Sequence, residues 1–324
     1  MRLVVVGAGA TGGFLGGFLA RAGHDVTLVA RGAQLEAMRR RGLVVRTAEG
    51  AFTVRPRCTD DLGAVGDADA AFLAVKAHAV APLAPRLGKS LGPDTALVTL
   101  QNGIPWWYFQ RHGGPLEGTR LEAVDPDGAI ERNLDARHVV GAVVYPATRI
   151  VEPGVIEHVE GTRFTIGEPD GSRSERCQAI ADALVESGLK CPVRTDIRKE
   201  IWLKLIGNAV LNPLSALTRA SLAALAADPG TRAAALGAMG EAVGVAGAVG
   251  VELDLSVEQR LEGAARVGEH RTSMLQDVEA GRPLEVDALV GAVVEIGHLV
   301  GLELPRLETL YACVKLLDRG LRGG

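Results

Sequence analysis

The first candidate for a functional site is a row of polar side chains on a segment with a strongly helical pattern. Lys204, Asn208 and Asn212 are spaced four residues apart, so in a helix they share one face, opposite apolar residues. Asparagine is a poor helix former, and two of them in an otherwise apolar helix need hydrogen-bonding partners. We therefore expect this face to line a ligand site. The alternative is a face exposed to solvent, which this segment alone does not exclude.

A glycine-rich run at the start of the chain is the second candidate. Gly7, Gly9 and Gly12 match the pattern G-x-G-x-x-G, with Ala10 and Thr11 between them. The run follows a β-branched strand and opens a helix, which is the context in which this pattern binds a dinucleotide. The first glycine permits a tight turn, the second a close approach of the pyrophosphate, and the third close packing of helix on strand. N–H groups at the helix N-terminus suit phosphates. The alternative is a glycine-rich turn without a ligand.

The end of the second predicted strand indicates which dinucleotide binds. NAD sites usually place Asp or Glu there, to bind a ribose hydroxyl. In this chain the position holds Arg31, and the next acid is Glu36. A guanidinium suits the 2′-phosphate of NADP. We therefore predict NADP(H) as the cofactor, the alternative being a solvated arginine.

Polar residues also follow two later strands. Lys76 comes directly after the apolar run 70–75, and Gln101-Asn102-Gly103 comes after the run 96–100. Ligands bind at the carboxyl ends of parallel strands, so both sites are candidates for contacts to cofactor or substrate. An exposed lysine and a simple turn are the alternatives.

Two more polar residues stand near predicted helix starts. Ser273 begins or lies within one helix, and Glu285 follows a Gly/Pro break just inside the next. Taken alone, they are an exposed serine and a first-turn acid that complements the helix dipole. Their spacing does not establish that they meet Lys204.

The elements that must position these residues change in character along the chain. Buried-strand patterns alternate with helical ones in the first half, which favours a doubly wound parallel sheet. These strands are expected at 3–6, 25–29, 70–75 and 96–100. Three further runs indicate an antiparallel extension of the sheet. They are 139–145, 155–158 and 163–166.

After about residue 196 the periodicity is almost entirely helical. Proline-containing breaks should separate the helices. These breaks are Asn212-Pro213, Asp228-Pro229, Arg282-Pro283 and Leu304-Pro305. We predict an α/β Rossmann-type dinucleotide-binding domain over 1–195 and an all-α C-terminal domain over 196–324.

Composition narrows the classes of function. The 324 residues carry a formal net charge of −4 and no basic stripe, so neither nucleic acid nor a membrane is an expected partner. Four scattered cysteines lack the spacing of a metal site, which points to reduced thiols, a cytoplasmic protein and no metal. A small-residue helix around 237–247 would pack closely, either within its domain or across a homodimer.

Six blocks taken together resemble the 2-dehydropantoate 2-reductase (ketopantoate reductase) family. Their order and spacing agree over essentially the whole chain. The blocks are GAGATGG at 7–13, AVK at 74–76, QNG at 101–103, WLKLIGNAVLNP at 202–213, SMLQD at 273–277 and PLEVD at 283–287.

The resemblance implies an active site in the cleft between a Rossmann-type and an all-helical domain. It assigns one set of residues to NADPH, namely Gly7, Gly9, Ala10, Thr11, Gly12, Arg31, Lys76 and Asn102. It assigns a second set to substrate and catalysis, namely Asn102, Lys204, Asn208, Asn212, Ser273 and Glu285.

Hydride transfer to a 2-oxo carbon builds negative charge on the carbonyl oxygen. Lys204 would stabilise that charge and donate the proton as general acid. Glu285 would hold Lys204 and bind a substrate hydroxyl, while Asn102 and Ser273 bind the substrate carboxylate. The implied reaction is reduction of 2-dehydropantoate to (R)-pantoate, a step of pantothenate biosynthesis.

One segment departs from the family pattern. After Gln101-Asn102-Gly103 comes an aromatic run, 104–109, and then about thirty more residues before Val139. The run either caps the cleft or reshapes the substrate pocket, or it packs the domain junction, so a different branched or aromatic 2-oxo acid stays an alternative. His270 is a smaller departure, at a position where some members have an amide. A nucleotide sensor without catalysis is a third alternative, against which the retained Lys204 argues.

Overall fold

The computed structural model describes residues 1–254, 256–266, 268 and 271–323, and His270 lies outside them. The chain divides into two compact units. The sheet unit consists of Met1–Gln101, Trp106–Arg120 and Asp127–Ile197. The helical unit consists of Asn102–Pro105, Leu121–Pro126 and Arg198–Gly324.

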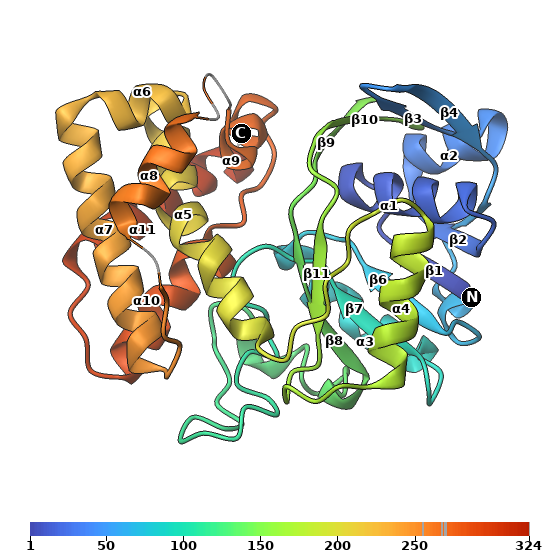
Figure 1. The fold of residues 1–324 in the computed structure, drawn as a ribbon, viewed down its shortest axis with the longest axis horizontal. Helices are drawn as coiled ribbons and strands as arrows, with labels where there is room; N and C mark the ends of the chain where they lie inside the picture. The colour runs from blue at the N-terminus through green and yellow to red at the C-terminus, as the bar shows by residue number, and fades with distance from the viewer. Residues whose placement is uncertain (255, 267, 269–270, 324) are drawn as a thin grey trace. The chain divides into compact units, whose positions relative to one another are not determined.

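The larger sheet of the sheet unit is mostly parallel. Within the described residues it has seven strands, in the order β11 (Phe164–Gly167), β8 (Val139–Val144), β7 (Ala96–Thr99), β6 (Ala70–Leu73), β1 (Arg2–Val6), β2 (Asp25–Val29) and β5 (Arg57–Thr59). All neighbours are parallel except β11, which runs antiparallel to β8. The four strands predicted from buried apolar runs, β1, β2, β6 and β7, confirm the Rossmann-type fold (Figure 1).

The prediction of an antiparallel extension was wrong for β8. This strand pairs in parallel with β7. A parallel pair needs a crossover of a dozen or more residues, and the long connection after β7 supplies it. This connection contains two short 3₁₀ helices, η3 (Pro126–Gly128) and η4 (Ala136–His138).

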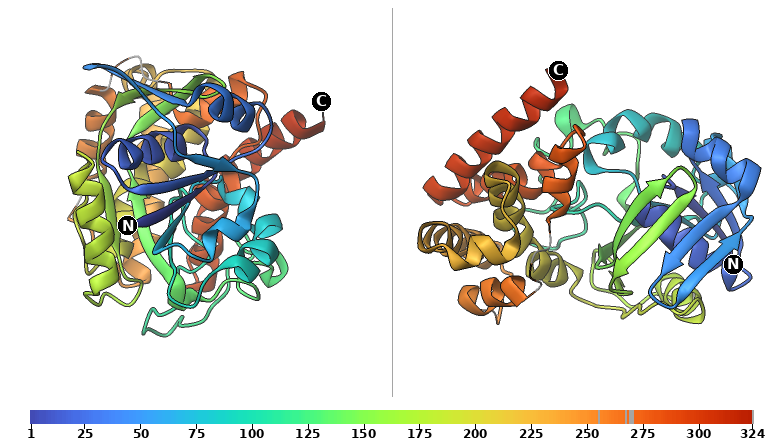
Figure 2. Two further views of the ribbon diagram at one scale, coloured as in Figure 1. Left: turned by 90° about the vertical axis from the view of Figure 1, so that its right-hand side faces the viewer. Right: turned by 90° about the horizontal axis from the view of Figure 1, so that it is seen from above.

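A second sheet, which the sequence did not predict, lies beside the first. Within the described residues it has the order β4 (Gly50–Val54), β3 (Leu43–Thr47), β10 (Val155–Glu160) and β9 (Ala147–Glu152). β3 and β10 are parallel, although more than a hundred residues separate them, and Figure 2 shows the green pair beside the blue pair. Of the three runs expected to extend the larger sheet, 155–158 lies in this second sheet as part of β10, whereas β8 and β11 belong to the larger sheet.

Helix α1 (Ala10–Arg21) is packed between the two sheets, and its glycines make this possible. A Cβ at Gly16 would lie 2.4 Å from Leu28 of the larger sheet. On the other side, a Cβ at Gly13 would lie 2.8 Å from Ile156, and one at Gly17 would lie 2.6 Å from Val45. Side chains on either face would push the helix away from a sheet, so the glycine-rich sequence sets this close packing.

The remaining helices of the sheet unit follow its strands. They are α2 (Gly32–Arg41), η1 (Leu62–Val65), η2 (Ala77–Ala79), α3 (Val80–Ser90) and α4 (Glu175–Glu186). The helical unit is built from α5 (Ile197–Thr218), α6 (Leu222–Ala227), α7 (Pro229–Ala248), α8 (Val257–Arg266), α9 (Ser273–Glu279), the π-helix η5 (Asp287–Gly291), α10 (Ala292–Leu299) and α11 (Pro305–Gly323). In the part of the chain that the structure describes, no helix has the length and apolarity to cross a bilayer.

Prolines begin two of the described helices of the helical unit. Pro229 and Pro305 each begin a helix, as predicted, because a first-turn residue needs no N–H donor. The predicted break at Asn212-Pro213 was wrong, since α5 continues to Thr218. Burial of Ser215 and Ala216 holds this last part of α5 in place, despite the hydrogen bond that Pro213 removes.

The small residues of α7 occupy two environments. A Cβ at Gly237 would lie 2.4 Å from Arg306, so this glycine packs within the unit. Cβ atoms at Gly240, Gly244 and Gly247 would meet no described atom within 4 Å. A homodimer through this stripe stays a prediction.

Candidate functional site

The glycine-rich loop has the geometry of a nucleotide-binding turn. Gly7 has a φ of +102°, which favours glycine, and its N–H donates to the Val29 carbonyl at 2.9 Å. A Cβ at Gly12 would lie 2.2 Å from the Gly7 oxygen, so the helix can approach the loop only because this residue is glycine. A Cβ at Gly9 would meet no described atom within 4 Å, which leaves the backbone open to a ligand.

This loop borders a groove within the sheet unit. The groove has a volume of about 460 Å³, and it is lined by Gly7, Ala8, Gly9, Val29, Ala30, Arg31 and residues of α3, among others. Gly9 caps α1, whose first turn carries no acidic side chain. The N–H groups of that turn have no acceptor within the helix, so they give the groove a positive end suited to phosphate.

Arg31, predicted to bind a 2′-phosphate, lines this groove together with a second cation, Arg86. Arg86 shares a face of α3 with Leu83, and Ala79, the N-cap of this helix, lines the groove as well. Sequence reasoning missed Arg86, although its spacing from Leu83 and Ala79 was a usable signal. Asp60 also faces the groove, and it pairs with Arg39 at 3.6 Å.

Gln34, also missed, holds the glycine-rich loop in place. Its side-chain amide donates to the Ala8 carbonyl at 2.9 Å, and its oxygen accepts from the Gly154 N–H at 2.9 Å. Gly154 belongs to the turn between β9 and β10, so one side chain ties the loop to the second sheet. No local pattern could reveal this pairing.

Lys76 lies half-buried at the N-terminus of η2, near the end of β6. Gln101 fixes the same region, because its side-chain amide donates to the Leu73 carbonyl at 2.7 Å and to the Val75 carbonyl at 2.9 Å. The structure thus gives the loop that carries Lys76 a defined position at the carboxyl ends of β6 and β7. A role for Lys76 toward the cofactor stays a prediction.

In the helical unit, the structure brings together two residues that are distant in sequence. The Lys204 ammonium donates to the Asn102 side-chain oxygen at 2.6 Å. Lys204, Asn208 and Asn212 lie on the single helix α5, with the first two half-buried and the third buried. Trp202, Ile206 and Val210 are buried, as the apolar pattern of this helix predicts.

Two further charges act on Lys204. The pKa of Lys204 is lowered from 10.5 to about 8, and burial is the largest cause. The charge of Glu285 raises this pKa, and the charge of Arg260 lowers it. Arg260 comes from α8, and a Cβ at Gly207 would lie 3.0 Å from its guanidinium. Gly207 therefore makes room for a cation that sequence reasoning missed. An amine with a pKa near 8 is largely protonated at neutral pH, yet it is a much stronger acid than a free lysine.

The other predicted substrate residues have defined places. Glu285 directly precedes the helical turn that leads into η5 and is half-buried. Ser273 is exposed and begins α9, which Thr272 caps by accepting from the Leu275 N–H at 3.2 Å. Contact of Ser273 with a substrate stays a prediction.

The aromatic run after Asn102 contributes to the core. Trp107 is 1% exposed, and its indole N–H donates to the Thr99 hydroxyl at 2.9 Å. A Cβ at Gly141 would lie 2.6 Å from the Trp107 ring, so the ring rests directly on β8. Tyr108 and Phe109 are also fully buried and contact each other edge to face. Trp107, Tyr108 and Phe109 therefore stabilise the sheet unit.

Comparisons with known proteins agree over the length of the chain. Residues 3–171 match the family description "Ketopantoate reductase PanE/ApbA", and residues 196–318 match "Ketopantoate reductase PanE/ApbA C terminal". A curated 2-dehydropantoate 2-reductase from Mesorhizobium japonicum is 50% identical over 99% of both chains. One from Halobacterium salinarum is 33% identical over 98% of this chain and 99% of its own.

Solved structures agree as well. The crystal structure of a protein from Ralstonia solanacearum MolK2 superposes with a TM-score of 0.94, at 40% identity over 98% of both chains. These matches confirm the resemblance seen in the sequence motifs. The chain belongs to the ketopantoate reductase PanE/ApbA family, whose members are dinucleotide-dependent oxidoreductases.

Proposed function

We propose that the protein reduces 2-dehydropantoate to (R)-pantoate with NADPH, a step of pantothenate biosynthesis in the cytoplasm. The Lys204–Asn102 hydrogen bond of 2.6 Å carries this proposal, because it holds an acidic amine on the helix whose sequence matches the family. Curated relatives named 2-dehydropantoate 2-reductase support the choice of substrate.

The groove of the sheet unit fits NADPH. Gly9 leaves its backbone open, the start of α1 offers N–H groups to the pyrophosphate, and Arg31 offers a guanidinium to the 2′-phosphate. Ala10, Thr11 and Lys76 complete the proposed cofactor set. When bound, the reduced nicotinamide supplies a hydride to the 2-oxo carbon. On this basis we assign residues 1–195 to cofactor binding and residues 196–324 to substrate binding.

The proposed role of the helical unit is to stabilise the developing alkoxide. Lys204 donates a hydrogen bond to the carbonyl oxygen and then its proton, while Asn102 orients the ammonium. The carboxylate of Glu285 favours the protonated form of Lys204 and accepts from a substrate hydroxyl. Asn208, Asn212 and Ser273 hold the rest of the substrate, and Arg260 adds a positive charge suited to the substrate carboxylate.

The test follows NADPH absorbance with a panel of branched, linear and aromatic 2-oxo acids. We expect turnover of 2-dehydropantoate to exceed that of every other acid. A different best substrate would overturn the assignment of substrate but keep the reaction. Binding of NADPH without any turnover would leave only a dinucleotide sensor.

A matched pair of variants tests the general acid. Lys204→Ala should lower kcat by on the order of a hundredfold or more and leave NADPH binding nearly intact. Lys199→Ala is the control, because this lysine lies on the same helix and pairs with Asp254 at 3.5 Å. Equal rates in the two variants would remove Lys204 from the mechanism.

A further inference from the structure

The helix that follows Glu285 begins with an irregular turn. In η5, the Ala292 N–H donates to the carbonyl of Asp287, five residues back, instead of to Ala288. The Ala288 carbonyl, which would accept from Ala292 in an α-helix, accepts from the N–H of Ile104 at 2.9 Å. The π-helical turn thus frees a backbone acceptor for a segment from far away in the sequence.

That segment includes Asn102, whose side chain accepts from Lys204. Gly103 lies between the two contacts, with a φ of +90°. A Cβ at Gly103 would lie 2.2 Å from the Ala288 oxygen, so the Gly103 backbone is in close contact with the π-helical turn. The position of Asn102 is therefore constrained by the hydrogen bond of the nearby Ile104 amide to Ala288.

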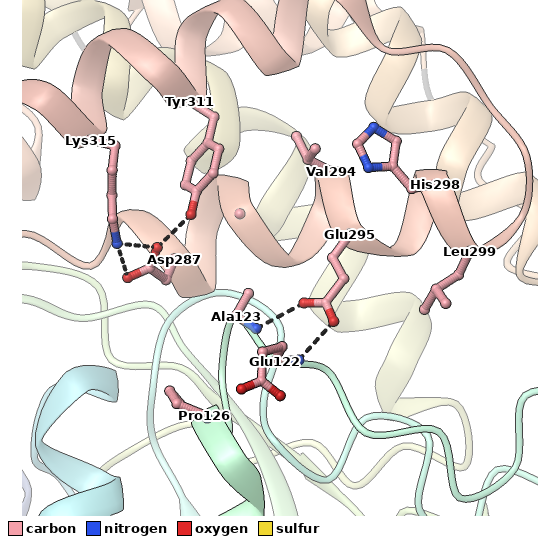
Figure 3. Close-up of a pocket in the computed structure, with 11 residues that line it drawn as sticks. Glu122, Ala123, Pro126, Asp287, Val294, Glu295, His298, Leu299, Tyr311 and Lys315 are labelled. Carbon is pink, nitrogen blue, oxygen red and sulfur yellow. Dashed lines mark hydrogen bonds and ion pairs between the residues drawn. The ribbon is translucent and has the colours of Figure 1, made fainter.

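Three side chains hold the π-helical turn itself. The Asp287 carboxylate accepts from the Lys315 ammonium, with both of its oxygens at 2.5 Å, and from the Tyr311 hydroxyl at 2.7 Å. Both donors come from α11, as Figure 3 shows. A Cβ at Gly291 would lie 3.0 Å from the Tyr311 ring, so the last residue of the turn packs beneath that ring.

The three groups are partly shielded from water, which strengthens their attraction. The Asp287 side chain is 34% exposed and that of Lys315 is 27% exposed. They line one end of a hollow of about 710 Å³ within the helical unit (Figure 3). The described hydrogen bonds of the Asp287 side chain come from α11, so we expect its effect on Lys204 to pass through the backbone of η5.

We propose that Asp287 is a positioning residue for the reaction: held by Lys315 and Tyr311, it keeps η5 π-helical, and η5 anchors Asn102-Gly103-Ile104 so that Asn102 orients the Lys204 ammonium. The inference rests on the proposed function. It adds a group outside the substrate site that governs the placement of the general acid. Misplacement of a catalytic group by about 1 Å can cost on the order of a hundredfold in rate.

The test compares Asp287→Asn with Glu308→Gln. Glu308 is a matched control, because it pairs with His298 at 2.6 Å and so also joins α10 to α11, but away from η5. We expect Asp287→Asn to lower kcat by about tenfold or more, with NADPH affinity unchanged, and to speed hydrogen exchange at the Ile104 amide. Glu308→Gln should change neither quantity.

A double-mutant cycle separates positioning from general damage. If Asp287 acts through Asn102, adding Asp287→Asn to Asn102→Ala should cause no further loss of kcat. The inference would be overturned if Asp287→Asn lowered kcat as much in the Asn102→Ala background as it does when introduced alone. Unchanged hydrogen exchange at the Ile104 amide would overturn it as well. Tyr311→Phe removes a single hydroxyl from the same contact and should shift both readouts in the same direction, even where Asp287→Asn does not fold.

The proposed function and the positioning role of Asp287 can be refuted independently of each other. Exchange at the Ile104 amide requires no turnover, so it reports on the anchor whatever the substrate is. A wild-type protein that reduces no 2-oxo acid would refute the proposed function. An exchange rate at the Ile104 amide that is unchanged by Asp287→Asn would refute the positioning role.

Discussion

The acidity of Lys204 leads to a prediction about the pH dependence of the reaction. Its pKa of about 8 is well below the ordinary 10.5, and burial is the main cause. This lowering corresponds to about 3 kcal/mol against the ammonium. Reduction uses the protonated amine, so kcat/KM should be constant below pH 7 and fall tenfold per pH unit well above pH 8. The reverse oxidation uses the neutral amine and should rise over the same range.

Two substitutions should move the descending limb of this pH profile, the range over which kcat/KM falls, in opposite directions. Glu285 raises the pKa of Lys204, so Glu285→Gln should shift the limb to lower pH. Arg260 lowers that pKa, so Arg260→Met should shift the limb to higher pH. A change of about one pH unit in each direction is the expected size for a neighbouring charge in a partly buried site.

The assay is the single-turnover rate of NADPH oxidation between pH 6 and 10.5, with saturating cofactor and limiting substrate. The position of the limb is independent of the absolute rate, so variants that are slower overall still report the pKa. Lys199→Met serves as the control and should leave the limb in place. A limb near 10.5 in the wild type, or shifts of the same sign in both variants, would refute the electrostatic account.

Three further predictions concern the sheet unit. Arg31→Ala should weaken the binding of NADPH more than that of NADH, by about tenfold or more in Kd; equal losses measured by fluorescence titration would refute the 2′-phosphate assignment. Gly12→Val should abolish binding of either nucleotide and lower the Tm, because a Cβ there would lie 2.2 Å from the Gly7 oxygen; a variant with unchanged Tm would contradict the close packing. Glu168 is 1% exposed, and although burial raises its pKa, hydrogen bonds from Arg176 and Ser174 outweigh that effect and lower it. Its contribution to stability is therefore present above the ordinary carboxyl pKa and is lost as the pH falls through the lowered value, so Glu168→Gln should cost about 2–3 kcal/mol at pH 7 and progressively less below pH 4 in denaturant titrations.

The elements that the sequence predicted are those with a local signature. The central strands β1, β2, β6 and β7 are continuous apolar runs, and burial on both faces requires that composition. The glycine pattern predicted a turn and a close helix, which the +102° φ of Gly7 and the contacts of Gly12 match. The spacing of Lys204, Asn208 and Asn212 likewise predicted a shared helix face, because α5 is regular over this stretch.

The features that escaped prediction depend on partners far along the chain. β3 pairs with β10, and no local pattern encodes a pairing over more than a hundred residues. Pro213 looked like a helix end, but packing of the following turn overrides its cost. Arg260 acts on Lys204 from α8, and no sequence pattern pointed to it. Asn102 and Glu285 were placed near Lys204 only by the family resemblance, because the spacing of residues on separate elements does not reveal the Lys204–Asn102 hydrogen bond.

The path of the chain also limits how the protein can be divided. Two short pieces of its first half, Asn102–Pro105 and Leu121–Pro126, belong to the helical unit. There the Ile104 amide bonds to Ala288, and the Glu122 and Ala123 amides bond to the Glu295 carboxylate at 2.7 and 2.8 Å. A fragment cut after residue 197 would leave these three donors without their acceptors. A chimera that takes the helical half from a relative must therefore take both short pieces from the same relative. Otherwise these backbone donors and their acceptors would come from different parent proteins.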